Sequence, residues 1–433
     1  MKIPPVKGTR DFYPPEMAVR NWMIDGWKKV SVRNGFEEYD GPIFEYLKMF
    51  QIKSGDEIVE QLFSLQDRGG RDLAIRPEIT PTLARMVNQQ INSLPRPIKW
   101  FSVPRLCRAE RPQKGRLREF FQWNIDIIGV DSSVADAELI FTTIDYLRMV
   151  GLTPKDIQIR ISSRKLLAAV LLSVGISEDD LDVLYALLDK KTKLPAETFE
   201  QMLLEKVGEQ AKADEISSFM AVASIDEIGQ AVTMDSDIER AVVELETVFA
   251  SLAVMGVAEY CVFDPSIVRG LAYYTGIVFE VHGATGELRA IAGGGRYDNL
   301  LRDFGGPAIS ATGMGMGDCV LELLLREKGL LDSQLGKRRL DYFVTFADKL
   351  FGGTMYEVAA ELRSRGYSAN FSYKLGGLSK QLKEASAQNA AKCIIIGQEF
   401  AESNQLAIKD MTTGEQELVD YGAFLSGLEP RDT

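Results

Sequence analysis

The segment at residues 105–129 constrains the fold of this chain most, because it joins a dense cluster of positive charge to a regular strand pattern. Its first half contains one acidic residue, Glu110, among the basic residues Arg105, Arg108, Arg111, Lys114, Arg116 and Arg118. From residue 121 to 127 apolar and polar side chains alternate, which is typical of a β-strand buried on one face. A Pro-Gln-Lys-Gly break at 112–115 indicates a turn. The segment therefore predicts a β-hairpin with a cationic tip, a surface that suits a phosphate-bearing ligand held over a sheet.

The length of 433 residues exceeds what one ordinary core holds, so we expect two or three domains. Apolar residues make up 45% of the chain and charged residues 26%, as in a soluble globular protein. No uncharged apolar run approaches the roughly eighteen residues needed to cross a bilayer. The first fifteen residues contain no hydrophobic segment of the signal-peptide kind. We therefore expect a cytoplasmic protein with no membrane partner.

Charge and residue counts exclude several classes of function. The net charge of −12 argues against a general nucleic-acid coat, although a nucleic acid could still meet a local basic patch. The only histidine is His282, so no site that needs two histidines can exist within one chain. We expect His282 to be exposed beside a glycine-containing turn. The four cysteines form no Cys-x-x-Cys pair, so we expect free thiols and no tightly bound protein metal. Arginine, lysine, carboxylates and a metal carried by the ligand are left to perform the chemistry.

Before residue 164 the periodicity predicts alternating helices and strands. We expect a helix at 16–34, a broken strand-like segment at 37–50, a β-hairpin at 61–80, a helix at 134–150 and a strand at 156–163. The helix after the hairpin should have Thr80 or Thr82 as its cap, with Pro81 in its first turn. Because Pro42 cannot donate a ladder hydrogen bond, its segment should lie at an edge or an interface.

From about 164 to 255 the chain becomes rich in Leu, Glu, Asp, Lys and Ala with helical periodicity, which predicts a helical insertion. This pattern is equally compatible with a helical bundle that has only a structural role and with an insertion that contacts a substrate directly. Strands return at 259–283 and 288–301. A glycine-dense stretch at 313–325 then leads into a helix, but it lacks a Walker pattern. We slightly favour a tight strand-to-helix packing contact there over phosphate binding.

The last part of the chain predicts a separate domain. Residues 326–338 are expected to be a linker, and residues 339–433 alternate as β, α, β, α, β, β, which predicts a compact α/β domain. Its basic residues fall on helix ends and loops, where each one is individually better read as part of a solvated face: Arg363, Arg365, Lys374, Lys380 and Lys383.

Four motifs in one order resemble the histidyl-tRNA synthetase family: RPEIT (76–80), RAERPQKGRLREFFQ (108–122), RGLAYYTG (269–276) and GGGRYD (293–298). The resemblance covers nearly the whole chain. It implies an α+β catalytic core at 1–325 with a mixed, mainly antiparallel sheet of the class II type, interrupted by the insertion at 164–255. It further implies that the α/β domain at 339–433 binds the anticodon. The implied reaction converts histidine and ATP to histidyl-adenylate, releases pyrophosphate and transfers histidine to the 3′ end of tRNA(His).

The resemblance also implies roles for particular residues. Arg108 and Arg269 would flank the α-phosphate as catalytic residues, because guanidinium groups stay cationic while negative charge develops. Together with Arg116 they would bind ATP, which brings Mg²⁺ with its phosphates. Arg111 and Gln113 would contact the acceptor end of the tRNA. The positions that match the histidine-binding site are Glu78, Thr80, Gln122, Asp126, Tyr273, Tyr274 and Tyr297.

Within that set, Glu78, Thr80 and Gln122 match positions that would hold the amino group of histidine. Tyr274 and Tyr297 match positions that would meet its imidazole. The segment around Pro42 resembles the class II dimer interface, which implies a homodimer.

Two residues depart from the family pattern. Val320 stands where class II enzymes usually carry an arginine that stacks on the adenine, and Ala272 stands where an aspartate is common. Loss of the stacking cation should weaken ATP binding by about 1–2 kcal/mol. The departure lends weight to an alternative, a catalytically silent regulatory subunit of ATP phosphoribosyltransferase. The intact RPQKGR loop and the complete C-terminal domain favour the enzyme, and RGLAYYTG with GGGRYD disfavours a synthetase for another amino acid.

Overall fold

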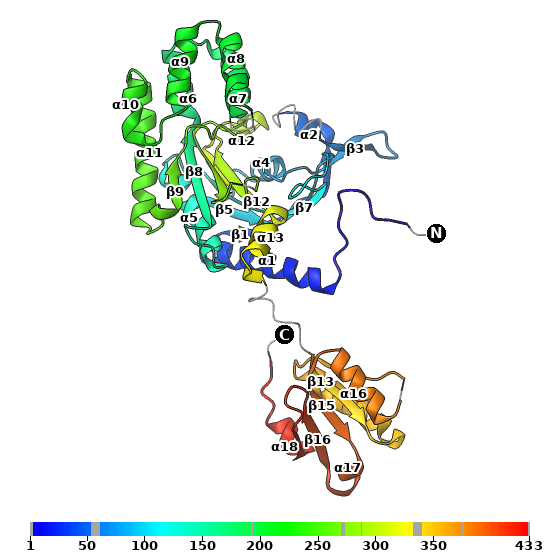
Figure 1. Cartoon of the computed structure of the whole chain (residues 1–433). Coiled ribbons are helices and arrows are strands. Elements are labelled where there is room, and N and C mark those ends of the chain that lie inside the picture. The colour runs from blue at the N-terminus through cyan, green and yellow to red at the C-terminus, as the bar shows by residue number, and fades with distance from the viewer. Residues whose placement is uncertain are drawn as a thin grey trace. The chain divides into compact units, whose positions relative to one another are not determined.

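The computed structural model describes residues 3–52, 61–191, 194–269, 273–286, 288–331, 340–374 and 376–431. The chain divides into two compact units, Met1–Leu331 and Asp332–Thr433, and each has its own sheet (Figure 1). The segment expected to be a linker, 326–338, begins within helix α13 (Asp318–Glu327), and residues 332–339 lie outside the described part. The domain limits at 325 and 339 stay predictions.

The first unit is built on a mixed sheet in the order β1-β5-β7-β12-β11-β10-β8-β9. Only the two outer pairs along this order, β1 with β5 and β8 with β9, are parallel, which confirms the expected mainly antiparallel sheet. The strands are β1 (Glu37–Glu38), β5 (Ile98–Ser102), β7 (Glu119–Ile128), β8 (Ile157–Ser163), β9 (Cys261–Phe263), β10 (Ile277–Gly283), β11 (Ala292–Arg296) and β12 (Ala311–Gly317).

The expected hairpin at 105–129 is present. Strand β6 (Arg105–Cys107) pairs antiparallel with β7, so that Arg105 lies opposite Phe121. At the tip, the backbone groups of Gln113 and Arg116 bond each other in both directions, which closes the turn. The hairpin therefore carries the basic loop to one end of a long central strand.

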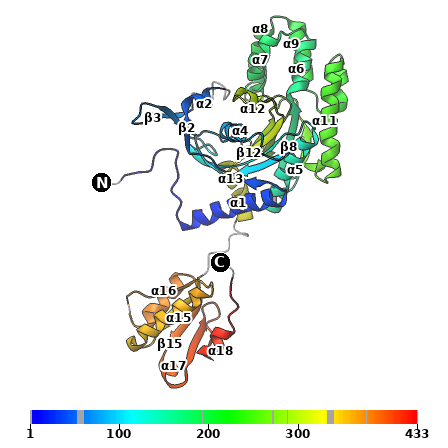
Figure 2. The same cartoon turned by 180° about the vertical axis from the view of Figure 1, so that it is seen from behind.

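The central strand β7 turns Trp123, Ile125 and Ile127 to an apolar face of the sheet, and it turns Gln122, Asn124 and Asp126 to the other face. Helices α1 (Pro14–Arg33) and α5 (Val134–Met149) cover the apolar face (Figure 2). There Trp123 of β7 stacks on Trp27 with ring centroids 6.4 Å apart, and its Nε1 donates to Ser31 Oγ at 2.8 Å. Burial of these large aromatic side chains fixes which face of β7 is turned inward. The opposite face is left to the polar residues of β7.

A small sheet of β2 (Phe44–Tyr46), β4 (Asp72–Ile75) and β3 (Phe63–Gln66) contains the predicted hairpin. Helix α2 (Leu47–Gln51) follows β2, and α4 (Thr80–Gln89) follows the hairpin. Pro81 lies in the first turn of α4, but the cap prediction is wrong: Thr80 and Thr82 are already helical, and Ile79 occupies the cap position without a side-chain bond. Pro81 suits the first turn of α4 without a side-chain cap, because proline has no backbone N–H that would need a hydrogen-bond acceptor.

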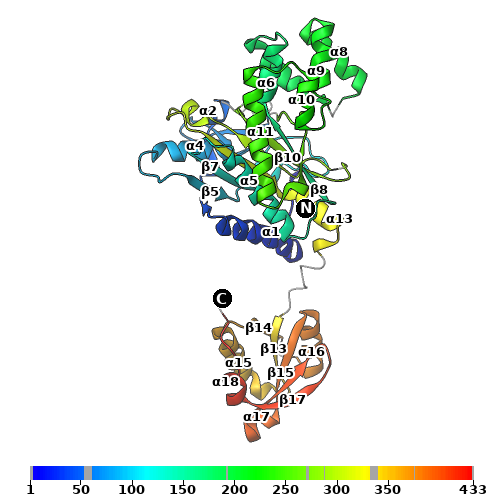
Figure 3. The same cartoon turned by 90° about the vertical axis from the view of Figure 1, so that its left-hand side faces the viewer.

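In the described part of residues 164–254, helices are joined by turns and short irregular segments. The helices are α6 (Arg164–Ser173), α7 (Leu181–Leu188), α8 (Ala196–Val207), α9 (Gln210–Phe219), α10 (Ile228–Ala231) and α11 (Ser236–Val254), with short 3₁₀ turns between them. Helix α11 packs along α5 and α6. Helices α8 and α9 extend away from the sheet (Figure 3). The helical insertion is thus anchored to the core by its first and last helices.

The second unit is an α/β domain with strand order β14-β13-β15-β16-β17. Its elements are β13 (Leu340–Phe346), α15 (Gly352–Ser364), β14 (Ala369–Phe371), α16 (Leu378–Ala387), β15 (Ala390–Ile396), α17 (Gln398–Ser403), β16 (Gln405–Asp410), β17 (Gln416–Asp420) and α18 (Tyr421–Ser426). The expected order β, α, β, α, β, β is present, and the domain additionally contains α17, β17 and α18.

Candidate active site

Four glycines form an open floor on the polar face of the main sheet. In the antiparallel register, Gly293 of β11 lies opposite Gly315 of β12, and Gly295 opposite Gly313. Paired residues in such a ladder share a face, so these positions leave a patch of backbone without side chains. The glycine-dense stretch is therefore a strand, and its close contacts lie between strands. The expected strand-to-helix packing contact is wrong for Gly313 and Gly315, because a Cβ at these positions would meet Asp126 or Gln122 of β7 and no helix.

Side chains from neighbouring segments lie directly over this floor. A Cβ at Gly313 would stand 1.9 Å from Asp126 Oδ1, and one at Gly315 would stand 2.7 Å from Gln122 Nε2. A Cβ at Gly293 would stand 2.5 Å from Arg269 Nη1. No real Cβ atom has such contacts, so glycine is required for these polar groups to reach the sheet.

A pocket of about 190 Å³ opens beside the floor. Its lining includes Arg108, Glu110, Arg116, Phe120, Gln122, Arg269, Ile291, Gly293, Gly315 and Val320. Three arginines from two distant segments thus meet at one pocket with an aromatic ring and small apolar groups. Such a lining suits a ligand with a flat apolar part and an anionic part.

Each of the three arginines has partners that hold it, and Glu110 pairs with both Arg108 and Arg116. Arg108 Nε donates to the carbonyl oxygen of Pro77 at 3.0 Å, and its guanidinium carbon lies 5.3 Å from the centre of the Phe120 ring. Arg116 forms an ion pair with Glu110, a buried carboxylate of the same hairpin. Arg269 bonds Glu280 of β10. Glu110 and Glu280 therefore fix guanidinium groups at the edge of the pocket.

Arg269 has an unusual backbone. Its φ of 65° is in the left-handed region, where a residue with a Cβ is strained by about 1–2 kcal/mol. Burial opposes the ionisation of Glu280, but Arg269 and His282 outweigh it and lower the pKa of this carboxyl to about 2. Glu280 raises the pKa of Arg269 in turn, against the opposing effect of burial. The pair is therefore fully charged at neutral pH.

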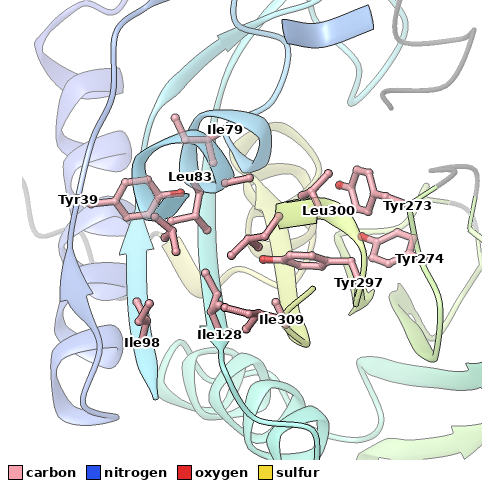
Figure 4. Close-up of a cluster of buried hydrophobic side chains, with 14 of the residues drawn as sticks. Tyr39, Ile79, Leu83, Ile98, Ile128, Tyr273, Tyr274, Tyr297, Leu300 and Ile309 are labelled. Carbon is pink, nitrogen blue, oxygen red and sulfur yellow. The ribbon is translucent and has the colours of Figure 1, made fainter. Parts of the chain in front are cut away.

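A buried polar cluster adjoins the pocket. Tyr297 donates its hydroxyl hydrogen to Asp126 Oδ1 at 2.6 Å, and Tyr273 donates to Glu78 Oε2 at 3.2 Å. Tyr273, Tyr274 and Tyr297 gather at one side of a larger core cluster (Figure 4). Tyr273 lies 5.0 Å from Tyr274 and 5.8 Å from Tyr297 between ring centres. The cluster combines carboxylates, hydroxyls and aromatic faces at one place.

The pKa of Asp126 is strongly shifted in this cluster. Burial raises its pKa to about 7, although the hydrogen bond from Tyr297 lowers it. Its Oδ2 is buried and has no hydrogen-bond partner among the described residues. A buried acid with a free oxygen is a candidate for contact with a ligand.

The segment 76–80 is fixed by its first residue. Arg76 is buried and donates to Asp40 Oδ1 and to the carbonyl oxygen of Gly41, both at 2.7 Å. Glu78 is then buried beside the tyrosines, while Thr80 is partly buried in the first turn of α4. The structure places Glu78 in the polar cluster, and it gives Thr80 a position at the start of the adjacent helix.

The residues assigned to the tRNA end lie in the hairpin loop. Arg111 and Gln113 are exposed, and Gln113 Oε1 accepts from Arg289 Nη2 at 2.6 Å. Arg289 had no role in the sequence-based assignment, since it lies outside the four motifs. On the other side of the loop, a Cβ at Gly115 would stand 3.0 Å from Val320 Cγ2. The loop therefore packs against Val320, which lines the pocket. Ala272 lies outside the described residues.

Sequence reasoning also missed Glu280 and misjudged His282. His282 is only 21% exposed, and its Nε2 lies 2.9 Å from Glu280 Oε2, so the expectation of an exposed residue is wrong. The physical reason is that positions 278, 280 and 282 of β10 face the same way as the glycine floor. Alternation along β10 could have indicated this, but only with the pairing of β10 and β11 known.

Pro42 is exposed next to an apolar surface made by Ile43, Phe44, Tyr46 and Leu65. Among the described residues, no group of three or more His, Cys, Asp or Glu side chains could hold a metal ion. No helix in the same ranges is long and apolar enough to cross a bilayer.

Comparisons with known proteins agree with this geometry. The family model for histidyl-tRNA synthetase matches residues 8–317, and an anticodon-binding-domain model matches residues 343–430. A chloroplastic and mitochondrial histidine–tRNA ligase of Arabidopsis thaliana is 39% identical over 99% of this chain and 86% of its own length. A histidine–tRNA ligase of Haloquadratum walsbyi is 37% identical over 97% and 96%.

Among solved structures, histidyl-tRNA synthetase from a Nostoc species has a TM-score of 0.81, with 98% of each chain covered and 24% identity, which supports the fold. Because the sequence relatives span nearly the whole chain and are named as ligases, the regulatory-subunit alternative is not favoured. The chain therefore belongs to the histidyl-tRNA synthetase family of class II aminoacyl-tRNA synthetases.

Proposed function

We propose that this chain is a histidine–tRNA ligase: it activates histidine with ATP to histidyl-adenylate and transfers histidine to the 3′ end of tRNA(His). One observation carries the assignment to this pocket. Three arginines line a glycine-floored pocket that adjoins a buried cluster of tyrosines and carboxylates. Arginines suit the phosphates of ATP, and the cluster suits a small polar amino acid.

Arg108, Arg116 and Arg269 bind ATP in this proposal, with Mg²⁺ arriving on its phosphates. A carboxylate oxygen of histidine attacks the α-phosphorus, the bond from that phosphorus to the bridging oxygen breaks, and pyrophosphate leaves. Arg108 and Arg269 act as catalytic residues by stabilising the negative charge that develops on the α-phosphate. The nucleophile is already a carboxylate, so the step needs no general base from the protein.

Phe120 and Val320 line the same pocket as the arginines. We assign the adenine to this apolar side, with the ring of Phe120 as its stacking surface. The phosphates then extend toward the guanidinium groups. This arrangement uses an aliphatic side chain where related enzymes have an arginine.

Histidine lies over the glycine floor in this proposal. Glu78, Thr80 and Gln122 hold its ammonium group through oxygen acceptors. Its imidazole meets Tyr274 and Tyr297 with Tyr273 beside them, and Asp126 offers the buried oxygen that lacks a partner among the described residues.

The tRNA contacts both units. Arg111 and Gln113 in the exposed hairpin loop reach the acceptor end, since a basic loop at the mouth of the pocket can bind phosphates and unpaired bases. The second unit binds the anticodon, in agreement with the family model that matches it. A cytoplasmic location stays a prediction.

We also propose a homodimer. The apolar side chains near Pro42 include Phe44 and Tyr46, which are 57% and 58% exposed. Phe44 and Tyr46 are two positions apart on β2, and both Tyr46 and Leu65 pair with Leu73 of β4, so these exposed apolar side chains share one face of the small sheet. Exposed apolar side chains grouped in this way are typical of a protein interface. Pro42 lies at its edge, where the chain cannot continue a sheet.

The test is charging of tRNA(His) with radiolabelled histidine by the purified chain. The proposal expects an acid-stable, base-labile histidine ester on the terminal ribose, formed only with ATP. A chain that forms no ester with tRNA(His), although it binds ATP and histidine, would contradict the ligase assignment.

A further inference from the structure

The only histidine of the chain, His282, contacts Glu280, and Glu280 bonds the proposed catalytic residue Arg269. His282 and Glu280 are two positions apart on β10, so both side chains project from the same face of the sheet. His282 Nε2 lies 2.9 Å from Glu280 Oε2, and Glu280 Oε1 accepts from Arg269 Nη1. The three side chains therefore form a continuous series that ends at the pocket.

Contacts with neighbouring residues must hold Arg269 in place, because its backbone conformation is strained. Its φ of 65° is strained for a residue with a Cβ, and such strain persists only where surrounding contacts impose it. Its carbonyl oxygen accepts from Arg164 Nη2 at 3.3 Å, and Gly293 supplies the space in which its guanidinium lies. Glu280 forms an ion pair with the guanidinium itself, which also has a side-chain hydrogen bond with Tyr274.

The two oxygens of Glu280 have different partners, and this division sets the orientation of the carboxylate. Across the β8–β10 pair, Glu280 also lies opposite Arg160, a second cation on the same face. Arg160 bonds Asp264 at 3.3 Å. If the bond from His282 were lost, Glu280 could turn away from Arg269 and toward Arg160.

Arg269 keeps donors available for a ligand. One of its terminal nitrogens bonds Glu280, the side chain of Tyr274 also bonds the guanidinium, and its buried Nε has no hydrogen-bond partner among the described residues. A guanidinium anchored at one side presents its remaining N–H groups in a fixed plane.

We propose that Glu280 and His282 are positioning residues for adenylate formation: Glu280 anchors Arg269 over Gly293, and His282 holds Glu280 in the orientation that does so. The inference rests on the proposed function, since it assigns this role in the activation of histidine. It explains why the one histidine of the chain lies partly buried beside an ion pair.

The first test measures histidine-dependent ATP–pyrophosphate exchange in Glu280→Gln and His282→Ala. Glu280→Gln should lower kcat about 100-fold, because a displaced Arg269 no longer meets the transition state, while KM for histidine changes little. His282→Ala should lower kcat about 10-fold. His282→Gln, whose amide can still donate to Glu280, should recover most of that loss. Glu244→Gln, which removes an exposed carboxylate paired with Lys165, is the control and should leave kcat unchanged.

The second test distinguishes positioning from general stability. Arg269→Ala should regain activity when guanidinium ion is added below denaturing concentration, because Glu280 can bind the free cation. The double variant Arg269→Ala with Glu280→Gln should show no such rescue. Equal rescue in both variants would overturn the proposal, as would a kcat in Glu280→Gln within about twofold of the unmodified chain. If the unmodified chain itself lacks histidine-dependent exchange, the proposed function fails instead. Circular dichroism verifies that each variant is folded.

Discussion

At the scale of single residues, the site is made of side chains that complete one another's hydrogen bonds across long sequence distances. Tyr297 bonds Asp126, and Tyr273 bonds Glu78. The motifs identified these residues one by one because each match depends on local sequence. Which pairs they form could not be predicted, since pairing depends on strand order in the sheet. Glu280 escaped notice for the same reason: only the register of β10 with β11 places it near Arg269.

Asp126 gives the site a measurable pH dependence. Burial raises its pKa to about 7, whereas an exposed aspartate titrates near 3.8. Between these values the unfolded chain is ionised at this residue and the folded chain keeps the proton, so the free energy of unfolding falls as pH rises. Relative to the unmodified chain, Asp126→Asn should therefore become more stable by about 1.4 kcal/mol per pH unit between pH 4 and 7. Urea unfolding at several pH values measures this difference, and parallel curves for both proteins would contradict the prediction.

Val320 provides a second test at this scale. Because the loop residue Gly115 already lies against Val320, an arginine at 320 would displace the loop from the pocket. We predict that Val320→Arg raises KM for ATP by about 10-fold and leaves KM for histidine within twofold. Val320→Ile, which adds volume without charge, should have a smaller effect. A lower KM for ATP in Val320→Arg would instead mean that the position accepts a stacking cation.

At the scale of elements, the hairpin of β6 and β7 was predictable because alternation and a turn signal are properties of adjacent residues. The role of β12 was not predictable. Its glycines permit both a tight turn and a strand, and the side chains above them, Gln122 and Asp126, belong to a different part of the chain. The cap of α4 was misassigned because a threonine near a helix start satisfies the cap pattern even when it lies inside the first turn.

The glycine floor yields a matched pair of variants. Gly313→Ala would place a methyl group 1.9 Å from Asp126 Oδ1, so Asp126 must move. We predict that this variant weakens histidine binding at least about 10-fold by isothermal titration calorimetry. Gly317 lies on the same strand, and a Cβ there would have no atom within 4 Å. Gly317→Ala should therefore bind histidine almost normally, and equal losses in both variants would refute a specific role for the floor.

At the scale of the whole molecule, the mainly antiparallel sheet was expected only from the family resemblance. Sequence periodicity itself predicted a helical insertion and a separate α/β domain. These features follow from composition and local pattern, which act over tens of residues. The contact of the insertion with tRNA was left open, and the helices α7, α8 and α9 do not decide it. The exposed apolar surface near Pro42 was indicated only through the family resemblance, because a proline break does not reveal which side chains stay uncovered.

The proposed homodimer is testable on that surface. Phe44→Arg places a charge among exposed apolar side chains, and we predict that it shifts the chain from dimer to monomer in sedimentation-velocity experiments. Leu350→Arg is the control: Leu350 is 88% exposed in the second unit and should not affect assembly. An unmodified chain that sediments as a monomer, or a Phe44→Arg variant that stays dimeric, would contradict this interface.

The central claim is that the glycine-floored pocket activates histidine and no other amino acid. ATP–pyrophosphate exchange with each of the twenty amino acids in turn tests this claim most directly, because it reports adenylate formation without requiring tRNA. The account predicts exchange that depends on histidine alone and that falls by orders of magnitude in Arg269→Ala. Absence of exchange with every amino acid, or faster exchange with an amino acid other than histidine, would contradict it.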